Sequence, residues 1–209
     1  MAEITAVFSD LGGVVLTNGW EINSRIRAAA RFGLDRDDLE KRHRALFNDL
    51  ETGKLGFDEY LRRTVFYQPR PFTLEEFKDF IFGESALAET SEVIFGLSQS
   101  RKYLMATLNN ESLELNLYRI RRFGLRNYFS VFFSSCFVGM RKPDPGIYRM
   151  ALRITQRSPS ESLFIDDRIE NVEGAKQAGM HAIQCRDTAQ LRQDLERLGV
   201  VVEPAPAYP

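Results

Sequence analysis

Five short runs of apolar residues, separated by longer stretches with a helical pattern, constrain the fold of this chain more than any other feature. Each run is rich in β-branched, aromatic or aliphatic side chains. Continuous apolar runs of this length are typical of strands that are buried on both faces of a sheet. The runs cover residues 4–9, 103–107, 131–134, 163–165 and 181–184.

From residue 103 onward, the segments between the runs have the spacing and the end signals of helices. Leu113, Leu117 and Ile120 recur at helical spacing, and Asp144 followed by Pro145 is a typical helix start. Strands that alternate with helices predict an α/β fold in which a parallel sheet is covered on both faces. Ligands of such sheets bind beyond the carboxyl ends of the strands, so the residues that follow each strand are the first candidates for a site.

Residues 20–87 depart from this alternation, because their pattern is almost entirely helical with short breaks near Gly33, 52–53 and 68–71. This pattern predicts a helical module of about 65 to 70 residues inserted after the first strand. The alternative is a single compact α/β domain with one enlarged connection. We expect a core formed by residues 1–18 and 88–203, an all-α insertion over 19–87, and a proline-rich tail over 204–209.

The charges of the chain nearly balance, with 28 Lys and Arg against 29 Asp and Glu and a net charge of −1. Such a chain has no general field that attracts nucleic acid or a membrane surface, and no segment approaches the roughly 18 to 20 apolar residues of a membrane helix. Two cysteines offer no disulfide framework, so we expect a cytoplasmic protein. A cluster of arginines could bind an anion, although we expect it to lie on a solvated helix face: Arg119, Arg121, Arg122 and Arg126.

Asp10 directly follows the first apolar run and precedes Leu11, Gly12 and Gly13. A carboxylate at the end of a buried strand lies where ligands bind, and the two glycines let the backbone approach closely whatever is held there. An aspartate that caps a turn or a helix is the simpler alternative. Asp10 therefore indicates a ligand-binding site only if polar residues also follow the other predicted strands.

Polar residues do follow the second run, and a lysine precedes a predicted helix. Thr107 ends the run, and Asn109 and Asn110 lie just beyond it, so a hydroxyl and two amides are available to bind a phosphate oxygen. Lys142 stands shortly before the helix start at residues 144–145, where its charge could meet an anion. Each residue alone also has an ordinary explanation, as a strand end or a solvated charge.

Asp166 and Asp167 form an acidic pair directly after the fourth run, with Asn171 a few residues further on. Neighbouring carboxylates repel each other, and two of them beyond a buried strand make chemical sense when a hard divalent cation neutralises them. The alternative is a helix start at which an acid interacts with the helix dipole. Each stretch alone has an ordinary explanation, but chance rarely produces all four in this order. They lie around Asp10, Thr107, Lys142 and the pair Asp166–Asp167.

With these four stretches in this order, the chain resembles the haloacid dehalogenase superfamily of hydrolases that use an aspartate nucleophile. The resemblance implies a Rossmann-like core and a helical cap inserted between the first and second motifs, in agreement with the predicted insertion. The matching segments are residues 7–15, 104–107, Lys142 within 141–145, 165–167, and Asn171 within 171–175.

The resemblance also implies the reaction and the ions. Asp10 would attack phosphorus and form an aspartyl-phosphate that water then hydrolyses. Mg²⁺ would be bound by the Asp10 carboxylate, the Gly12 carbonyl oxygen and the Asp166–Asp167 pair, with Asn171 as support.

Three further residues are implied in binding the phosphoryl group. Thr107 and Lys142 would contact its non-bridging oxygens, and Lys142 would also balance the charge of the nucleophile. Asn109 is a further candidate for substrate binding, because its amide follows the second strand.

The sequence departs from the family pattern at Gly12, where phosphatases of this superfamily usually carry a second aspartate that acts as general acid and base. The loss of such a group costs about 10² to 10⁴ in rate. An acid from the cap could replace it, and the candidates are His43, Glu51, Asp58 and Glu59. Nothing in the sequence selects one of them.

We therefore expect a Mg²⁺-dependent phosphatase that acts on a small phosphate ester, such as a sugar phosphate, as a monomer or a homodimer, without nucleic acid or membrane. A 2-haloacid dehalogenase is one alternative, although Asp166 and Asp167 would repel its carboxylate substrate. A protein that binds metal and phosphate but turns over too slowly to matter, because of Gly12, is the other.

Overall fold

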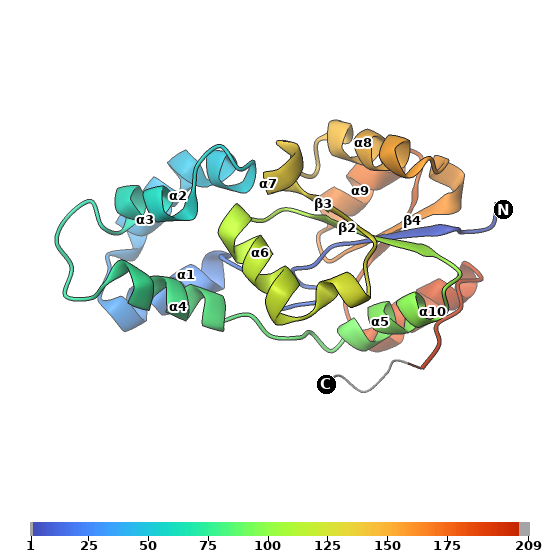
Figure 1. The fold of residues 1–209 in the computed structure, drawn as a ribbon, viewed down its shortest axis with the longest axis horizontal. Coiled ribbons are helices and arrows are strands. Elements are labelled where there is room, and N and C mark those ends of the chain that lie inside the picture. Colours follow the sequence, from blue (N-terminus) through green and yellow to red (C-terminus); the bar gives the residue numbers. More distant parts are fainter. Residues whose placement is uncertain (1, 205–209) are drawn as a thin grey trace.

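The computed structural model describes residues 2–204, which form a five-stranded parallel sheet flanked by helices (Figure 1). The strand order is β3-β2-β1-β4-β5, so that β1 lies at the centre between β2 and β4. All four pairs of neighbouring strands are parallel, which confirms the predicted fold class. The strands are β1 Ala6–Ser9, β2 Leu104–Asn109, β3 Val131–Ser134, β4 Ser162–Asp166 and β5 His181–Gln184.

Helices cover both faces of the sheet, which explains why the strands are apolar throughout. Along β1, Val7 packs into one apolar cluster, while Ala6 and Phe8 pack into another, because successive side chains point to opposite faces. Figure 1 shows α8 and α9 on one side of the sheet and α5 and α10 on the other. The helices of this part are α5 Ser91–Gln99, α6 Leu113–Arg122, α7 Ser135–Val138, α8 Pro145–Thr155, α9 Ile169–Gln177 and α10 Thr188–Arg197, with 3-10 turns at Leu125–Asn127 and Pro159–Glu161.

A second group of helices lies between β1 and α5 in the chain and stands beside the carboxyl ends of the strands (Figure 1). Its side chains form an apolar cluster that includes Trp20, Phe57 and Phe77, and Leu115 of α6 packs into the same cluster. A cluster that this segment largely builds supports our division into a cap over residues 19–87 and a core, which stays a prediction. The helices are α1 Ile22–Phe32, α2 Arg36–Glu51, α3 Phe57–Thr64 and α4 Leu74–Gly83.

The chain leaves the core and returns to it at one place. The backbone N–H of Thr17 donates to the carbonyl oxygen of Ala86 at 2.8 Å, and the N–H of Ala88 donates to that of Val15 at 3.0 Å. The two connecting segments, before α1 and after α4, therefore lie side by side and hold each other.

The predicted proline-rich tail, residues 204–209, lies outside the described residues except for Pro204. Within residues 2–204, no helix is long and apolar enough to cross a membrane.

Candidate active site

The carboxyl ends of the three central strands bring Asp10 and Asp166 to the same level. Ser9 of β1 pairs with Ile165 of β4, and the N–H of Asp10 donates to the carbonyl oxygen of Ile165 at 2.8 Å. Asp10 and Asp166, one residue further along neighbouring strands, consequently lie next to each other. The parallel arrangement thus places two acids from opposite ends of the sequence at one edge of the sheet.

Asp10, Asp166 and Asp167 form a tight acidic cluster, in which one carboxylate oxygen of each lies within 4.8 Å of those of the others. The ammonium group of Lys142 lies 3.0 Å from Asp10 Oδ1 and 2.5 Å from Asp166 Oδ2. Asn171 donates to both carboxylate oxygens of Asp166 at 3.1 Å. The structure therefore brings together the acids and the lysine on which the predicted metal and phosphate site depends.

Lys142 is buried, and a neighbouring amide holds its backbone. Asn110 Oδ1 accepts from the N–H of Lys142 at 2.8 Å, and Asn110 Nδ2 donates to the Lys142 carbonyl oxygen at 2.9 Å. Two bonds from one planar amide define the orientation of the lysine backbone. Asn110 is thus a positioning residue for the only cation within contact distance of Asp10 among the described residues.

The cluster carries more negative charge than Lys142 can balance. When all three carboxylates are ionised, the one ammonium group leaves two negative charges uncompensated. Burial raises the pKa of Asp10 to about 8, the charges of Asp166 and Asp167 act in the same direction, and Lys142 opposes them. Burial and the charge of Asp166 also raise the pKa of Asp167. Without a further cation, Asp10 would be largely protonated at neutral pH and a poor nucleophile.

A divalent cation fits this set of donors. The Oδ1 atom of Asp167 is buried and has no hydrogen-bond partner among the described residues, as expected of an atom that awaits a ligand. Hard cations prefer carboxylate and carbonyl oxygens of the kind that Asp10, Asp167 and Gly12 offer. At Gly13, φ is +75° and a Cβ atom would lie 2.2 Å from Asp167 Oδ2, so only glycine lets the acid approach so closely.

Thr107 does not line the cavity beside the cluster, contrary to what its place in the second motif implied. The strand β2 runs on to Asn109, and Thr107 lies inside it, paired with Ser9 and fully buried. Its hydroxyl has no partner among the described residues and no access to a ligand. Asn109, at the end of the strand, lines the cavity in its place.

Asn109 belongs to a closed triangle of buried polar side chains. Asn109 Nδ2 donates to Asn116 Oδ1 at 3.0 Å, Asn116 Nδ2 donates to Ser134 Oγ at 3.0 Å, and Ser134 Oγ donates to Asn109 Oδ1 at 2.9 Å. The triangle leaves the second hydrogen of the Asn109 amide free to meet a ligand. It also locks the amide in one orientation.

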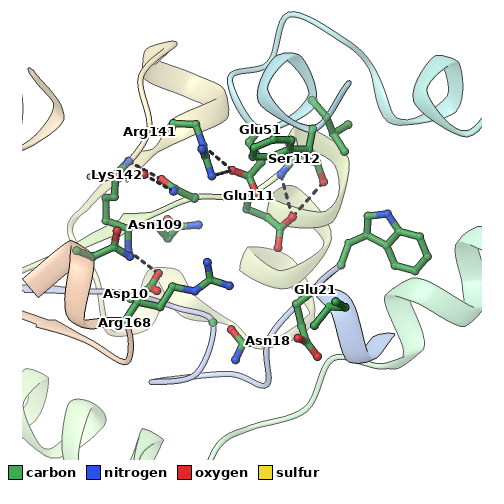
Figure 2. Close-up of a pocket in the computed structure, with 18 of the residues that line it drawn as sticks. Asp10, Asn18, Glu21, Glu51, Asn109, Glu111, Ser112, Arg141, Lys142 and Arg168 are labelled. Atoms are coloured by element: carbon green, nitrogen blue, oxygen red, sulfur yellow. Dashed lines mark hydrogen bonds and ion pairs between the residues drawn. The ribbon is translucent and has the colours of Figure 1, made fainter. Parts of the chain in front are cut away.

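A cavity of about 400 Å³ extends from the acidic cluster to the cap (Figure 2). Its core wall includes Asp10, Gly12 and Lys142, and its cap wall includes Trp20 and His43. Figure 2 shows Lys142 beside Asp10 and, further along the cavity, Glu51 bound to Arg141. The cavity joins the reactive carboxylate to a separate surface that could recognise the rest of a substrate.

Of the four acids and bases that the cap offered as candidates, two line the cavity and two do not. His43 and Glu51 line it. Asp58 instead forms an ion pair with Lys78 at 2.9 Å, and Glu59 pairs with Arg63 at 2.7 Å. The latter two are excluded from contact with a ligand in this cavity.

The space beside Gly12 belongs to Asn18. A Cβ atom at position 12 would lie 2.9 Å from Asn18 Oδ1. Asn18 Nδ2 lies 3.4 Å from Asp167 Oδ2, and both Gly12 and Asn18 line the cavity. A neutral amide therefore occupies the place toward which an acidic side chain at position 12 would point.

A buried ion pair in the cavity wall was not predicted from the sequence. Glu111 Oε2 lies 3.3 Å from Arg119 Nη1, and both side chains are buried. Arg119 also donates to Thr17 O at 3.0 Å and to Ser85 Oγ at 3.1 Å, in the two segments that connect cap and core. The expectation that Arg119 lies on a solvated face is wrong; its place four residues after the buried Leu115, on the same side of α6, was the available signal.

The comparison with protein families agrees with this geometry. A family model of haloacid dehalogenase-like hydrolases matches residues 4–179. The chain belongs to this family. Membership confirms the resemblance that the four motifs indicated, and it makes the protein a hydrolase.

Two relatives of this haloacid dehalogenase-like hydrolase have names that state an activity. The chain is 29% identical to D-ribitol-5-phosphate phosphatase of Bacteroides thetaiotaomicron over 202 residues, which cover 92% of this chain and 97% of the relative. It is 31% identical to flavin mononucleotide hydrolase 1 of Arabidopsis thaliana over 165 residues, which cover 78% of this chain and 66% of that protein.

Solved structures of family members share the fold. A haloacid dehalogenase family enzyme of Bacteroides thetaiotaomicron in complex with magnesium and inorganic phosphate has a TM-score of 0.74 at 19% identity, covering 88% of this chain and 94% of that one. An L-2-haloacid dehalogenase has a TM-score of 0.65 at 16% identity, covering 93% of this chain and 99% of that one. At such identities, the likeness extends to the fold alone.

Proposed function

We propose that this hydrolase is a Mg²⁺-dependent phosphatase that acts on a small phosphorylated metabolite. The observation that carries the proposal is the acidic cluster: Asp10 lies 3.0 Å from Lys142, beside two further carboxylates with two negative charges in excess. A divalent cation and a phosphate ester complement such a cluster, since the cation balances the acids and the lysine meets the ester. The two named relatives, a sugar-alcohol phosphatase and a nucleotide hydrolase, support a phosphate ester as substrate.

Each residue then has a defined task. The Asp10 carboxylate forms a bond to phosphorus while the ester P–O bond breaks, and water later attacks the aspartyl-phosphate, releasing phosphate and regenerating the carboxylate. Lys142 and the free amide hydrogen of Asn109 bind non-bridging oxygens, whereas Thr107 is buried inside β2 and does not take part. Asp10, Asp166, Asp167 and the Gly12 carbonyl would hold Mg²⁺.

The bound Mg²⁺ would supply charge: it keeps the nucleophile ionised and shields it from the negative ester. The pKa of Asp10, raised to about 8 by burial without a cation, is the reason why this contribution is needed. The protein contributes orientation, because the N–H of Leu11 donates to Asp10 Oδ1 at 2.8 Å and Lys142 lies 3.0 Å from the same oxygen.

The site lacks a side chain arranged to protonate the leaving oxygen of the ester. Gly12 carries no acid, and neither cap candidate in the cavity is arranged as one. Burial lowers the pKa of His43 to about 4, so the ring is neutral at pH 7, and Glu51 is paired with Arg141 at 2.7 Å. We therefore expect esters with acidic leaving groups to react fastest.

The experiment follows phosphate release from p-nitrophenyl phosphate with Mg²⁺ and with EDTA. We expect release that depends on the metal and is lost in Asp10→Asn. Asp79→Asn, an exposed position on α4, is the matched control, and it should retain the activity. Thermal unfolding of both variants shows that the proteins are folded.

Two other results would point to the alternative functions. Chloride release from 2-chloropropionate without metal would indicate a dehalogenase, which the repulsion between three carboxylates and a carboxylate substrate argues against. Tight binding of phosphate without turnover would indicate the silent protein that Gly12 allows. Either result would refute the proposed phosphatase.

A further inference from the structure

A chain of hydrogen bonds runs through the cap to the wall of the cavity. The indole Nε1 of Trp20 donates to the hydroxyl oxygen of Tyr60 at 2.7 Å. The same hydroxyl lies 2.8 Å from His43 Nδ1. Tyr60 is fully buried, while Trp20 and His43 line the cavity. The chain therefore begins and ends at the cavity and passes through the core of the cap.

The direction of these bonds follows from the chemistry of the three groups. An indole nitrogen can only donate, so the Tyr60 oxygen accepts from Trp20. The hydroxyl proton of Tyr60 then needs an acceptor, because a buried donor without a partner is costly. His43 Nδ1, at 2.8 Å, is within hydrogen-bond distance of this hydroxyl and can accept the proton. Tyr60 donates to Nδ1, and the proton of a neutral His43 ring must consequently lie on Nε2.

The ring is neutral at physiological pH. Burial and the charge of Arg25 lower the pKa of His43 to about 4, and Glu40 only partly opposes them. Arg25 itself is bound to Glu40 by two hydrogen bonds, of 2.5 and 3.0 Å, so its charge is compensated. Glu51 is likewise paired with Arg141. Arg25 and Glu51, two charged residues that line the cavity with His43, are thus each paired with an opposite charge, which suits an uncharged, oxygen-rich group.

The Nε2 atom has no hydrogen-bond partner among the described residues, although His43 lines the same cavity as Asp10. With the protonation deduced above, Nε2 is a donor that faces a partner from outside the protein. We propose that the Nε2–H of His43 donates to an oxygen of the organic part of the substrate, which makes His43 a specificity-determining residue for hydroxylated phosphate esters. This inference rests on the proposed phosphatase function.

Two substitutions separate this role from a structural one. In His43→Asn, the amide oxygen takes the place of Nδ1 and can still accept from Tyr60, but no donor remains at the position of Nε2. In His43→Gln, the longer amide reaches the position of Nε2 and can donate, but the acceptor for Tyr60 is lost. A structural role predicts that the glutamine variant is the worse of the two. A substrate contact predicts the reverse.

The assay measures inhibition of p-nitrophenyl phosphate hydrolysis by D-ribitol 5-phosphate and by inorganic phosphate, so that the ribitol ester need not itself turn over. Its readout is the inhibition constant of D-ribitol 5-phosphate divided by that of inorganic phosphate. Inorganic phosphate lacks the organic part, so this ratio reports the contribution of the ribitol group alone. We expect this ratio to rise about tenfold in His43→Asn and by less than about threefold in His43→Gln, as for the loss of one hydrogen bond. His181→Asn, which does not line the cavity, is the control.

An equal ratio in the wild type and His43→Asn, or a larger change in His43→Gln, would overturn the inference. So would the absence of any gain in affinity from the ribitol part in the wild type. Hydrolysis of the aryl ester by the same preparations shows that the phosphatase function itself stands.

The protonation of the ring is tested without any activity. The chain has two histidines, so the ¹⁵N resonances lost in His43→Asn belong to His43. At pH 7 we expect a protonated Nε2, an unprotonated Nδ1, and a shift of Nε2 when D-ribitol 5-phosphate, but not inorganic phosphate, is added. A proton on Nδ1, or no such shift, would refute the inference. If p-nitrophenyl phosphate were not hydrolysed at all, the proposed function would fail, while this titration would still decide the role of His43.

Discussion

The wild-type protein should lose stability at mildly acidic pH because of His43. Replacing His43 with asparagine should make the free energy of unfolding less dependent on pH in this range. Burial lowers the pKa of His43 from 6.5 to about 4 in the folded protein. Between these two pH values, the unfolded chain binds a proton on this ring that the folded protein does not bind. The free energy of unfolding therefore falls as the pH falls through this window, and the effect is complete near pH 4.

The size of the effect follows from the two pKa values. Each pH unit within the window lowers the free energy of unfolding by about 1.4 kcal/mol. At pH 5, about 1.5 units below the ordinary pKa of histidine, the full effect would be about 2 kcal/mol. His43 is partly exposed, so solvent reduces the effect, and we expect about 1 to 2 kcal/mol.

Urea unfolding of the wild type and His43→Asn at pH 7 and pH 5 measures this quantity. Carboxylates that titrate in the same range are common to both proteins, so the difference between the two pH dependences isolates the imidazole. The asparagine can still accept from Tyr60, which keeps the native packing comparable. Parallel pH dependences of the two proteins would refute the claim that burial lowers the pKa of the His43 ring.

Three further substitutions test other parts of the site. Gly13→Ala should lower the free energy of unfolding by about 1 to 3 kcal/mol and weaken Mg²⁺ binding measured by calorimetry. Gly33→Ala is the control, because Gly33 has φ +59° and open space around it, so that this variant shows the backbone strain alone. Equal Mg²⁺ affinity in the two variants would contradict the close approach of Gly13 to the Asp167 carboxylate. Lys142→Met should lower kcat/KM for p-nitrophenyl phosphate by about 10² to 10³, and a loss under tenfold would remove Lys142 from phosphate binding. Arg119→Met should lower the free energy of unfolding, measured with urea, by about 3 to 5 kcal/mol, because Glu111 stays buried and unpaired. The double variant Arg119→Met, Glu111→Gln should recover much of this loss. No recovery would show that the loss of the ion pair is not the cause.

The sheet and most of the site were predictable from the sequence because both depend on local patterns. A strand buried on both faces must be apolar throughout, and residues that follow parallel strands must meet at one edge. The candidates Asp10, Lys142 and the pair Asp166–Asp167 were found in this way. The local sequence does not show, however, that these residues are within contact distance of one another.

The remainder depends on contacts between distant segments. The sequence pattern ends the second run at Thr107, whereas pairing with β3 extends β2 to Asn109 and leaves the threonine inside the strand. The pair of Glu111 and Arg119 forms only when the segments around Thr17 and the end of the cap meet. Which candidates of the cap face the cavity is likewise decided by how four helices pack on one another.

The hydrogen-bonded junction at Thr17 and Ala86 has an evolutionary consequence. An excursion that departs and returns at a single point leaves strand register unaffected, whatever its length or composition. Substitutions in helices α1 to α4 can therefore reshape the cavity wall for another metabolite, while the strand register that brings Asp10 beside Asp166 is kept.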